Sequence, residues 1–268
     1  MYKRSLTRDS HCTAYYRTYA GENTAPRPSW YSKELCLRSF LNSIRVAQQC
    51  FTIKLIVLHD GPASTNPAWQ ATVSRLAAPI GEITELPKRN NAESCLDAIR
   101  RACCLPDDEL VLFAEDDYLW LKPAVKEIAS ALTTLPCHYV TGYDHPVRYQ
   151  PDYPLGADWP HWHSTIHITD ERHWRSQEST CMTFASHAMT LKADLAYFER
   201  YHNNGKNTPD DRKLFRHLCG LGDYARQNNP RRVLLGPVPS LNTHLHVPWL
   251  APIVDWDSEA SAIIDSEM

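Results

Sequence analysis

Apolar positions in the first half of the chain form short segments that alternate between strand spacing and helix spacing. Runs rich in β-branched and aromatic residues predict strands at 13–20, 51–61, 81–87 and 109–117. Apolar residues at helical intervals predict helices at 29–48, 67–77 and 92–104. This alternation is typical of an α/β fold with a parallel, doubly wound sheet and right-handed crossovers.

The second half of the chain is less regular. Helical spacing recurs at 122–135, 192–203 and 207–221. Thr208 or Asp210 stands where the last of these helices would need a cap. Residues 164–191 alternate between apolar and polar types, so we expect β-hairpins there.

Neither a repeat nor a low-complexity linker interrupts the sequence. We therefore expect one domain over residues 1–268. The acidic residues from Asp255 onward are expected to form a loosely held tail.

Composition narrows the class of protein. The chain is 43% hydrophobic and 22% charged, and it has no apolar run of the ~18 residues that a membrane span needs. We expect no membrane insertion, and the N-terminus lacks the apolar core of a signal peptide, so we expect a cytoplasmic protein. Nine cysteines without a CxxC pair indicate reduced thiols. A net charge of −3 neither requires nor excludes a polyanionic partner.

Acidic residues gather where the predicted strands end. Glu115, Asp116 and Asp117 follow an apolar strand directly, and Asp60 ends an earlier strand. Ligands of open parallel sheets bind outside the carboxyl ends of the strands. Adjacent carboxylates repel one another, so they usually need a cation, hydrogen-bond donors or open solvent. Mg²⁺ and Mn²⁺ prefer such oxygen ligands, and a solvated acidic turn is the alternative.

Four motifs occur in the order found in GT-A fold glycosyltransferases. They are Asp60, the acids in "FAEDDYLW", "TPDD" before a late helix, and "THLH" after the last strand. The resemblance covers roughly residues 15–249, and "FAEDDYLW" is similar to the DxD motif of that family. The first strand reads "YYRTYA" and no QxxRW-like helix is present, so the chain departs from membrane-embedded polysaccharide synthases.

The resemblance implies a GT-A (Rossmann-like) fold, with a doubly wound, mostly parallel sheet, helices on both faces and a smaller β-rich acceptor-side region. Residues 1–121 would be the nucleotide-sugar-binding half, and 122–254 the acceptor-side half. Residues 255–268 would be the acidic tail.

The same resemblance implies a metal site. Asp117 would ligate Mn²⁺ or Mg²⁺ together with His244 or His246, and we prefer His244. The ion would neutralise the charge that develops on the leaving diphosphate. A histidine on a loop can equally be structural or solvated.

Donor-binding residues follow from the resemblance as well. Glu115 would hold the ribose or assist the metal, Asp116 would face the sugar or support the site, and Asp60 would accept a hydrogen bond from the nucleobase. Asp60 in "HDGP" can also be a plain turn residue. Four residues near the same edge could meet phosphate or nucleoside: Arg17, Lys88, Arg89 and Asn91.

The "TPDD" motif offers a general base. A carboxylate within hydrogen-bond reach can remove the proton of an acceptor hydroxyl. Asp211 is the first choice and Asp210 the second. The alternative for Asp210 is a helix N-cap, because Pro-Asp-Asp before an amphipathic run is good capping chemistry.

A stretch rich in Trp and His, "DWPHWHSTIH", contains His161, His163 and His167. Their spacing lacks the HExxH pattern of a helical zinc site. Aromatic rings in an irregular segment suit an acceptor surface, although Trp159 and Trp162 can equally pack in a core.

These features predict a metal-dependent glycosyltransferase that moves a sugar from a nucleotide diphosphate sugar, with UDP-sugar favoured, to a hydroxyl acceptor. The acceptor would be a surface glycan or a hydroxymethylated base in DNA, as for some phage-encoded members. The His- and Arg-rich region 144–175 could serve DNA, whereas the net negative charge counts against it. The alternatives are a non-catalytic nucleotide-sugar binding protein and a metal-dependent phosphohydrolase.

Overall fold

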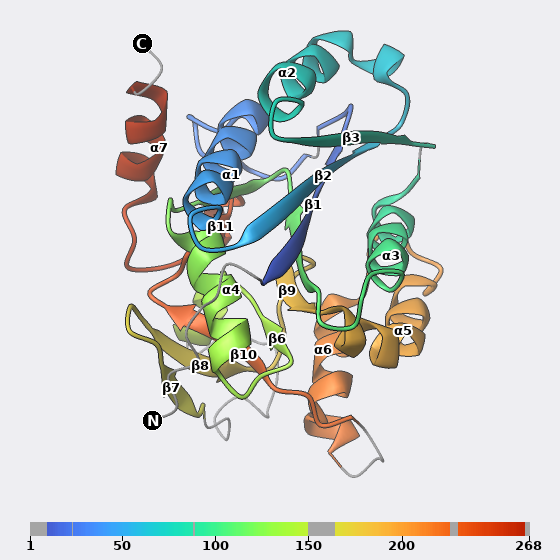
Figure 1. Cartoon of the computed structure of the whole chain (residues 1–268), viewed down its shortest axis with the longest axis vertical. Helices are drawn as coiled ribbons and strands as arrows, with labels where there is room; N and C mark the ends of the chain where they lie inside the picture. The colour runs from blue at the N-terminus through green and yellow to red at the C-terminus, as the bar shows by residue number, and fades with distance from the viewer. Residues whose placement is uncertain (1–9, 23, 88, 150–163, 226–229, 266–268) are drawn as a thin grey trace.

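The structure is a computed structural model that describes residues 10–22, 24–87, 89–149, 164–225 and 230–265 (Figure 1). These residues form a nine-stranded sheet in the order β3-β2-β1-β4-β9-β6-β10-β8-β7, and a two-stranded sheet of β11 and β5. The strands of the first half are β1 (His11–Tyr19), β2 (Thr52–Asp60), β3 (Gly81–Leu86), β4 (Leu110–Glu115) and β5 (Tyr118–Trp120). The later strands are β6 (Tyr139–Val140), β7 (Ile166–Ile168), β8 (His173–Gln177), β9 (Phe184–His187), β10 (Leu234–Val238) and β11 (Asn242–His244).

Four parallel strands form one half of the large sheet. β1 pairs in parallel with β2 on one side and with β4 on the other, and β2 pairs in parallel with β3. The chain winds outward from β1 to β3 and then returns to β4, so its direction across the sheet reverses between β1 and β4. A reversal of this kind is the point at which open α/β sheets bind ligands.

The other half of the sheet is mixed. β9 runs antiparallel to both β4 and β6, and β8 runs antiparallel to both β10 and β7. The remaining strands share one direction, which confirms the prediction of a mostly parallel sheet. The hairpin prediction for 164–191 is right for β7 and β8. It is wrong for β9, which lies inside the large sheet, and for the residues from Ala188 onward, which are helical.

Helices cover both faces of the sheet, as predicted. One core contains residues of α1 (Lys33–Ala47), α2 (Pro67–Ala77), α4 (Ala124–Thr134) and α7 (Trp256–Asp265). The other contains residues of α3 (Asn91–Ala102), α5 (Ala188–His202) and α6 (Asp211–Cys219). Strand β1 serves both cores because its side chains alternate: Tyr16 packs in the first and Tyr15 in the second.

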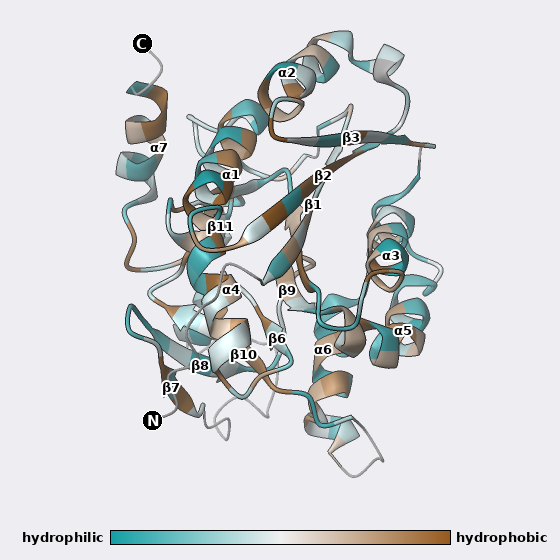
Figure 2. Cartoon of the chain, in the orientation of Figure 1, coloured by the Kyte–Doolittle hydropathy of each residue, from teal (hydrophilic) through white to brown (hydrophobic). Residues whose placement is uncertain are grey.

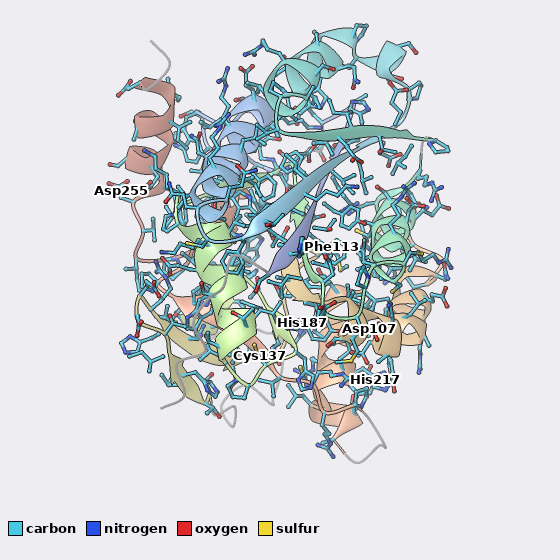
Figure 3. The ribbon with its side chains drawn as sticks, in the orientation of Figure 1. Asp107, Phe113, Cys137, His187, His217 and Asp255 are labelled. Atoms are coloured by element: carbon cyan, nitrogen blue, oxygen red, sulfur yellow. The ribbon has the colours of Figure 1, made fainter. Side chains whose placement is uncertain are left out.

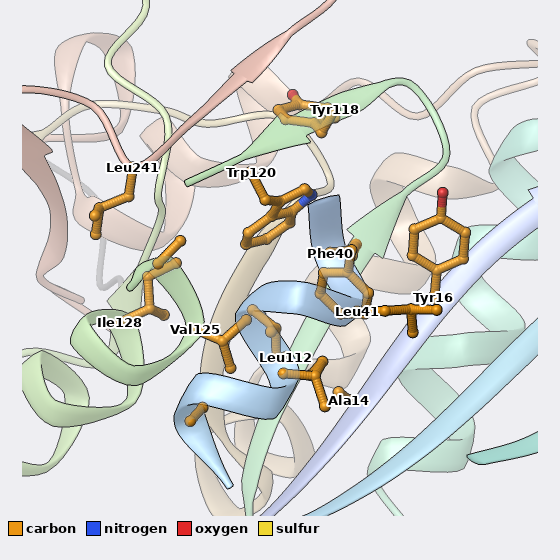
Figure 4. Packing of buried hydrophobic residues seen from close by; sticks show 14 of the residues in the cluster. Ala14, Tyr16, Phe40, Leu41, Leu112, Tyr118, Trp120, Val125, Ile128 and Leu241 are labelled. Atoms are coloured by element: carbon orange, nitrogen blue, oxygen red, sulfur yellow. The ribbon is translucent and has the colours of Figure 1, made fainter. Parts of the chain in front are cut away.

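Aromatic side chains fill the two cores. On the α1 side, the Phe40 ring lies 5.2 Å from Tyr16 and 5.0 Å from Trp120, between centroids (Figure 4). On the other side, Phe113 of β4 stacks on Tyr15 at 5.7 Å and lies in the interior of the molecule (Figure 3). Colouring by hydropathy shows apolar residues on β2 and on part of α1, with polar residues on the outer helices (Figure 2). The sheet is therefore clamped between two apolar layers.

Residues Trp256–Asp265 of the acidic tail form a packed helix, so the prediction that this part is loosely held is wrong. Helix α7 buries Trp256, Ala260 and Ile263 next to α1. These residues stand at i, i+4 and i+7, the spacing of one helix face. Trp30 Nε1 donates a 2.5 Å hydrogen bond to Asp257 Oδ1, which ties the acidic face to the body of the protein. The prediction considered the acidic residues of this segment and overlooked its short amphipathic pattern of buried residues.

All nine cysteines are free, in agreement with the prediction of reduced thiols. Within the described ranges, no helix has both the length and the apolar character that crossing a bilayer requires.

Candidate functional site

Arg17 and Glu115 meet at the carboxyl ends of β1 and β4, where the winding of the sheet reverses. The two residues are directly opposite in the β1–β4 register, and Arg17 Nη2 lies 2.6 Å from Glu115 Oε1. The same nitrogen donates to Asn91 Oδ1 of α3 at 3.0 Å. Burial raises the pKa of Glu115, although the charge of Arg17 opposes the shift. Three predicted donor-site residues from distant segments are thus brought together.

Asp116 points back toward β1. Its Oδ2 accepts from Thr18 Oγ1 at 2.6 Å and lies 2.9 Å from Lys33 Nζ. Lys33 also donates to the carbonyl of Tyr19 at 2.8 Å. The Asp116 residue is only 7% exposed. Through Thr18 and Lys33 its carboxylate is connected to the end of β1 and to the loop that follows. Of the two roles predicted for Asp116, the supporting one fits this geometry.

Asp117 lies between the guanidinium of Arg27 and the imidazole of His244. Its Oδ2 is 3.0 Å from Arg27 Nη2 and 3.0 Å from His244 Nε2. Burial alone would raise the pKa of Asp117, but the charges of His244 and Arg27 lower it well below its usual range. Strand β11 brings His244 here because it pairs antiparallel with β5, with His244 opposite Tyr118. The imidazole stacks on the Tyr118 ring at 5.1 Å.

His246 lies farther along the same segment. Its ring centroid is 6.1 Å from that of His244 and 6.3 Å from that of Trp249. His244 contacts Asp117 directly, and which of the two histidines would bind a metal stays a prediction.

Each carboxylate of the acidic triplet has a cation of the protein beside it. Glu115 pairs with Arg17, Asp116 with Lys33, and Asp117 with Arg27. Of the three ways in which such repulsion can be relieved, which are a bound cation, hydrogen-bond donors and open solvent, the described residues supply hydrogen-bond donors that carry positive charge.

The residues present do not fit a metal ion held by the protein alone. Within the part of the chain that the structure describes, no three His, Cys, Asp or Glu side chains form a group that could hold one. Asp117 and His244 make a pair at most, and Asp117 Oδ2 already lies 3.0 Å from Arg27 Nη2. Mn²⁺ or Mg²⁺ at this place stays a prediction.

Asp60 ends β2 at the same edge of the sheet. Its Oδ1 accepts from the backbone N–H of Arg89 at 2.9 Å, which connects β2 with the segment leading into α3. Burial raises the pKa of Asp60, although this hydrogen bond opposes the shift. The side chain of Arg89 pairs with Asp97 at 3.0 Å. Lys88 lies outside the described residues.

The two aspartates of "TPDD" have different surroundings. Asp210 caps α6, since its side chain accepts from the backbone N–H of Lys213 at 3.4 Å and lies 3.0 Å from Lys213 Nζ. Its role as the N-cap of α6 is therefore enough to explain an aspartate at position 210. Asp211 instead lines a cavity of about 140 Å³ with Tyr143, His145, Arg148 and other residues of the second half of the chain.

The environment of Asp211 perturbs its acidity. Burial raises the pKa of Asp211 to about 7, a hydrogen bond from the Arg212 N–H opposes the shift, and the charges of Glu115 and Asp210 add to it. The charge of His244 also acts on Asp211. Perturbed carboxylates in a cavity are typical of functional sites. Asp211 is thus close enough to Glu115 and His244 for their charges to act on it.

The Trp- and His-rich stretch contributes little that can be described. His161, His163, Trp159 and Trp162 lie outside the described residues, and His167 lies on the edge strand β7.

Two residues of the basic region nearby are engaged in ion pairs. Arg172 pairs with Glu127 at 2.6 Å and Arg175 with Asp144 at 2.5 Å. Both arginines are thus paired with carboxylates of the same half of the chain.

Arg27 and Lys33 were not predicted as site residues. Arg27 lies in the turn-like segment after β1, and Lys33 is the first residue of α1. A single basic residue in a polar turn carries no local signal of its role. Only the proximity of these segments to β4 reveals it.

No protein-family model matches the chain, and no curated protein matches it. Among solved structures it is similar to S. aureus TarS 1–349, with 12% identity, a TM-score of 0.41, and coverage of 68% of this chain and 48% of that one. It is also similar to the galactosyltransferase LgtC in complex with donor and acceptor sugar analogs, with 12% identity, a TM-score of 0.42, and coverage of 76% and 69%.

A third similar structure is CMP:2-keto-3-deoxy-manno-octonic acid synthetase complexed with CTP, with 10% identity, a TM-score of 0.47, and coverage of 97% and 100%. The chain thus spans about half the length of the TarS fragment that it matches. At these identities and TM-scores, the likenesses identify neither an activity nor functional residues for this chain.

Proposed function

We propose that this chain is a glycosyltransferase of the GT-A type, which moves a sugar from a nucleotide diphosphate sugar to a hydroxyl acceptor. The observation that carries the proposal is the convergence of three separate motifs at one edge of the sheet. Asp117 contacts His244 at 3.0 Å, and the charges of Glu115 and His244 act on Asp211. This edge includes the reversal between β1 and β4, where open α/β sheets bind ligands.

Asp211 is the general base in this proposal. A base is most effective when its pKa lies near the working pH, and burial raises the pKa of Asp211 to about 7. The carboxylate takes the proton of the acceptor hydroxyl while the acceptor oxygen bonds to the anomeric carbon. The bond from that carbon to the diphosphate breaks, and its electron pair leaves with the diphosphate.

The donor nucleoside is assigned to the carboxyl ends of β1 and β2. Arg17, Asn91 and Glu115 form a connected hydrogen-bond cluster there, and Asp60 lies at the end of the neighbouring strand. A carboxylate at Asp60 can accept from a base that carries an N–H on its pairing edge, as uracil does. We therefore propose a UDP-sugar as the donor.

A glycan hydroxyl is the favoured acceptor. The basic residues Arg172 and Arg175, which made DNA attractive as an acceptor, pair with Glu127 and Asp144. Ion-paired arginines have less charge to offer a phosphate backbone.

The test is a transfer assay on the full chain with Asp211→Asn as the key variant. UDP-sugars and other nucleotide sugars are offered with a glycan library and with DNA containing hydroxymethylcytosine, and products are identified by mass spectrometry. We expect transfer from one donor, loss of transfer in Asp211→Asn, and unchanged donor binding by calorimetry. Asp107→Asn is the matched control, since Asp107 is a 67% exposed aspartate paired with Lys192.

Two other results would point to the alternative functions. Donor binding without turnover in any acceptor mixture would indicate a nucleotide-sugar binding protein. Phosphate release from nucleotides without sugar transfer would indicate a phosphohydrolase. A chain that binds no nucleotide sugar would refute the proposal.

A further inference from the structure

Basic side chains of the protein already lie beside the acidic triplet, and a donor diphosphate bound here would contact them. We propose that Arg27 and His244, rather than a divalent metal ion, neutralise the diphosphate of the donor. The inference rests on the proposed glycosyltransferase function and specifies how that site holds its substrate. Both side chains contact the same oxygen, Asp117 Oδ2, at 3.0 Å.

Arg27 is held in place independently of Asp117. Its Nη1 donates to the backbone carbonyl of Leu245 at 2.6 Å, and its guanidinium lies 4.8 Å from the centre of the Tyr31 ring. The side chain is only 11% exposed, so it is a fixed cation rather than a mobile surface arginine. Guanidinium groups are well suited to phosphate because they donate several hydrogen bonds in one plane.

His244 is held from the other side. Strand pairing places it opposite Tyr118, and its ring stacks on that tyrosine with an interplanar angle of 14°. Its Nε2 points to the same carboxylate oxygen as Arg27. One anionic oxygen therefore sits between two positioned donors. A phosphate oxygen can take the place of the carboxylate oxygen and keep both charge-assisted hydrogen bonds.

Asp117 has opposite effects in the two mechanisms. If a metal ion bridged protein and diphosphate, Asp117 would attract the donor through the ion, and removing its charge would weaken binding. If Arg27 and His244 bind the diphosphate directly, Asp117 competes for the same cations and repels the donor. Removing the charge of Asp117 then leaves binding equal or tighter. The sign of this single effect distinguishes the mechanisms.

The experiment is calorimetric titration of the full chain with UDP, GDP, CDP, ADP and dTDP, with EDTA and separately with Mn²⁺. The variants are Asp117→Asn, Arg27→Gln and Arg27→Lys. Arg45→Gln is the matched control, because Arg45 is exposed on α1 and bonds only to Asn42 among the described residues. Circular dichroism melts check that each variant is folded.

With EDTA present, we expect one nucleotide to bind the wild-type chain about as tightly as with Mn²⁺, and Asp117→Asn to bind it at least as tightly. Arg27→Gln should raise the Kd about tenfold to a hundredfold, the usual effect of losing a hydrogen bond to a charged group. Arg27→Lys should lose less, since it keeps the charge. If Arg27→Gln is unfolded, the Asp117→Asn and Arg27→Lys results still decide the question.

Binding that requires Mn²⁺, or that Asp117→Asn abolishes, would overturn the inference while leaving the glycosyltransferase proposal intact. A chain that binds none of the five nucleotides under either condition would overturn both.

Discussion

Replacing Asp211 with asparagine should change how the stability of the protein depends on pH. Burial raises the pKa of Asp211 from 3.8 to about 7, and the charges of Glu115 and Asp210 add to the shift. Between these two values the folded state holds a proton that the unfolded state has released. The stabilising effect of that protonation is complete below the unfolded pKa and is lost as the pH rises through the folded pKa.

The size of this effect follows from the shift. A change of about three pKa units corresponds to about 4 kcal/mol of unfolding free energy. Asp211 lines a cavity and is partly exposed, so water screens its charge and about 2–4 kcal/mol is the expected range. Asparagine cannot ionise and therefore does not incur this cost at high pH. We expect Asp211→Asn to be more stable than the wild type at pH above the folded pKa, with the advantage disappearing toward low pH.

The difference in unfolding free energy between the wild type and Asp211→Asn can be measured by urea denaturation, followed by circular dichroism. The pH series should run from below the unfolded pKa of the aspartate to above its folded pKa. Asp107→Asn serves again as the control, since its exposed side chain should give a profile parallel to that of the wild type. Parallel profiles for wild type and Asp211→Asn would show that Asp211 titrates normally. The interpretation of Asp211 as a buried base would then be wrong.

Other predictions concern packing and charge. Trp256→Ala should destabilise the protein by about 3–5 kcal/mol in urea, because it removes the largest side chain that anchors α7, whereas Ala at the 43% exposed Ile264 should have little effect. Lys33→Met should cost about 3–5 kcal/mol, since it leaves the buried Asp116 without its cation, and adding Asp116→Asn should recover part of that loss in a double-mutant cycle. Asp117→Asn should reduce stability above the unfolded pKa of an aspartate, and the difference should shrink as the pH falls, because the lowered pKa of Asp117 stabilises the fold only while the unfolded carboxyl is ionised.

Local patterns in the sequence were sufficient for most of the fold. Strand β2 and helix α2 lie where the spacing of apolar residues predicts them. Such features depend on neighbouring residues along the chain, so a single sequence contains them. The prediction for the tail was wrong because it was based on the acidic residues alone. Trp256, Ala260 and Ile263 already have helical spacing in the sequence.

Features that depend on distant segments were harder to predict. Strand β9 lies between β4 and β6 in the large sheet, although its sequence only shows that it is a strand. His244 could be proposed from a motif, but its contact with Asp117 requires the pairing of β11 with β5. Arg27 has no motif and was missed.

The amino-acid pattern alone was enough to establish an alternating α/β fold and to place acidic residues at the ends of β2 and β4, because periodicity and strand ends are local properties. The basic side chains that pair with those acids are determined only by the tertiary structure. Coulomb energy depends on distance in space, and the loop after β1, the start of α1 and strand β11 approach β4 only in the folded chain. The sequence therefore placed Arg17 near the acidic residues but not Lys33 or Arg27, and only the structure shows which acid each of the three contacts.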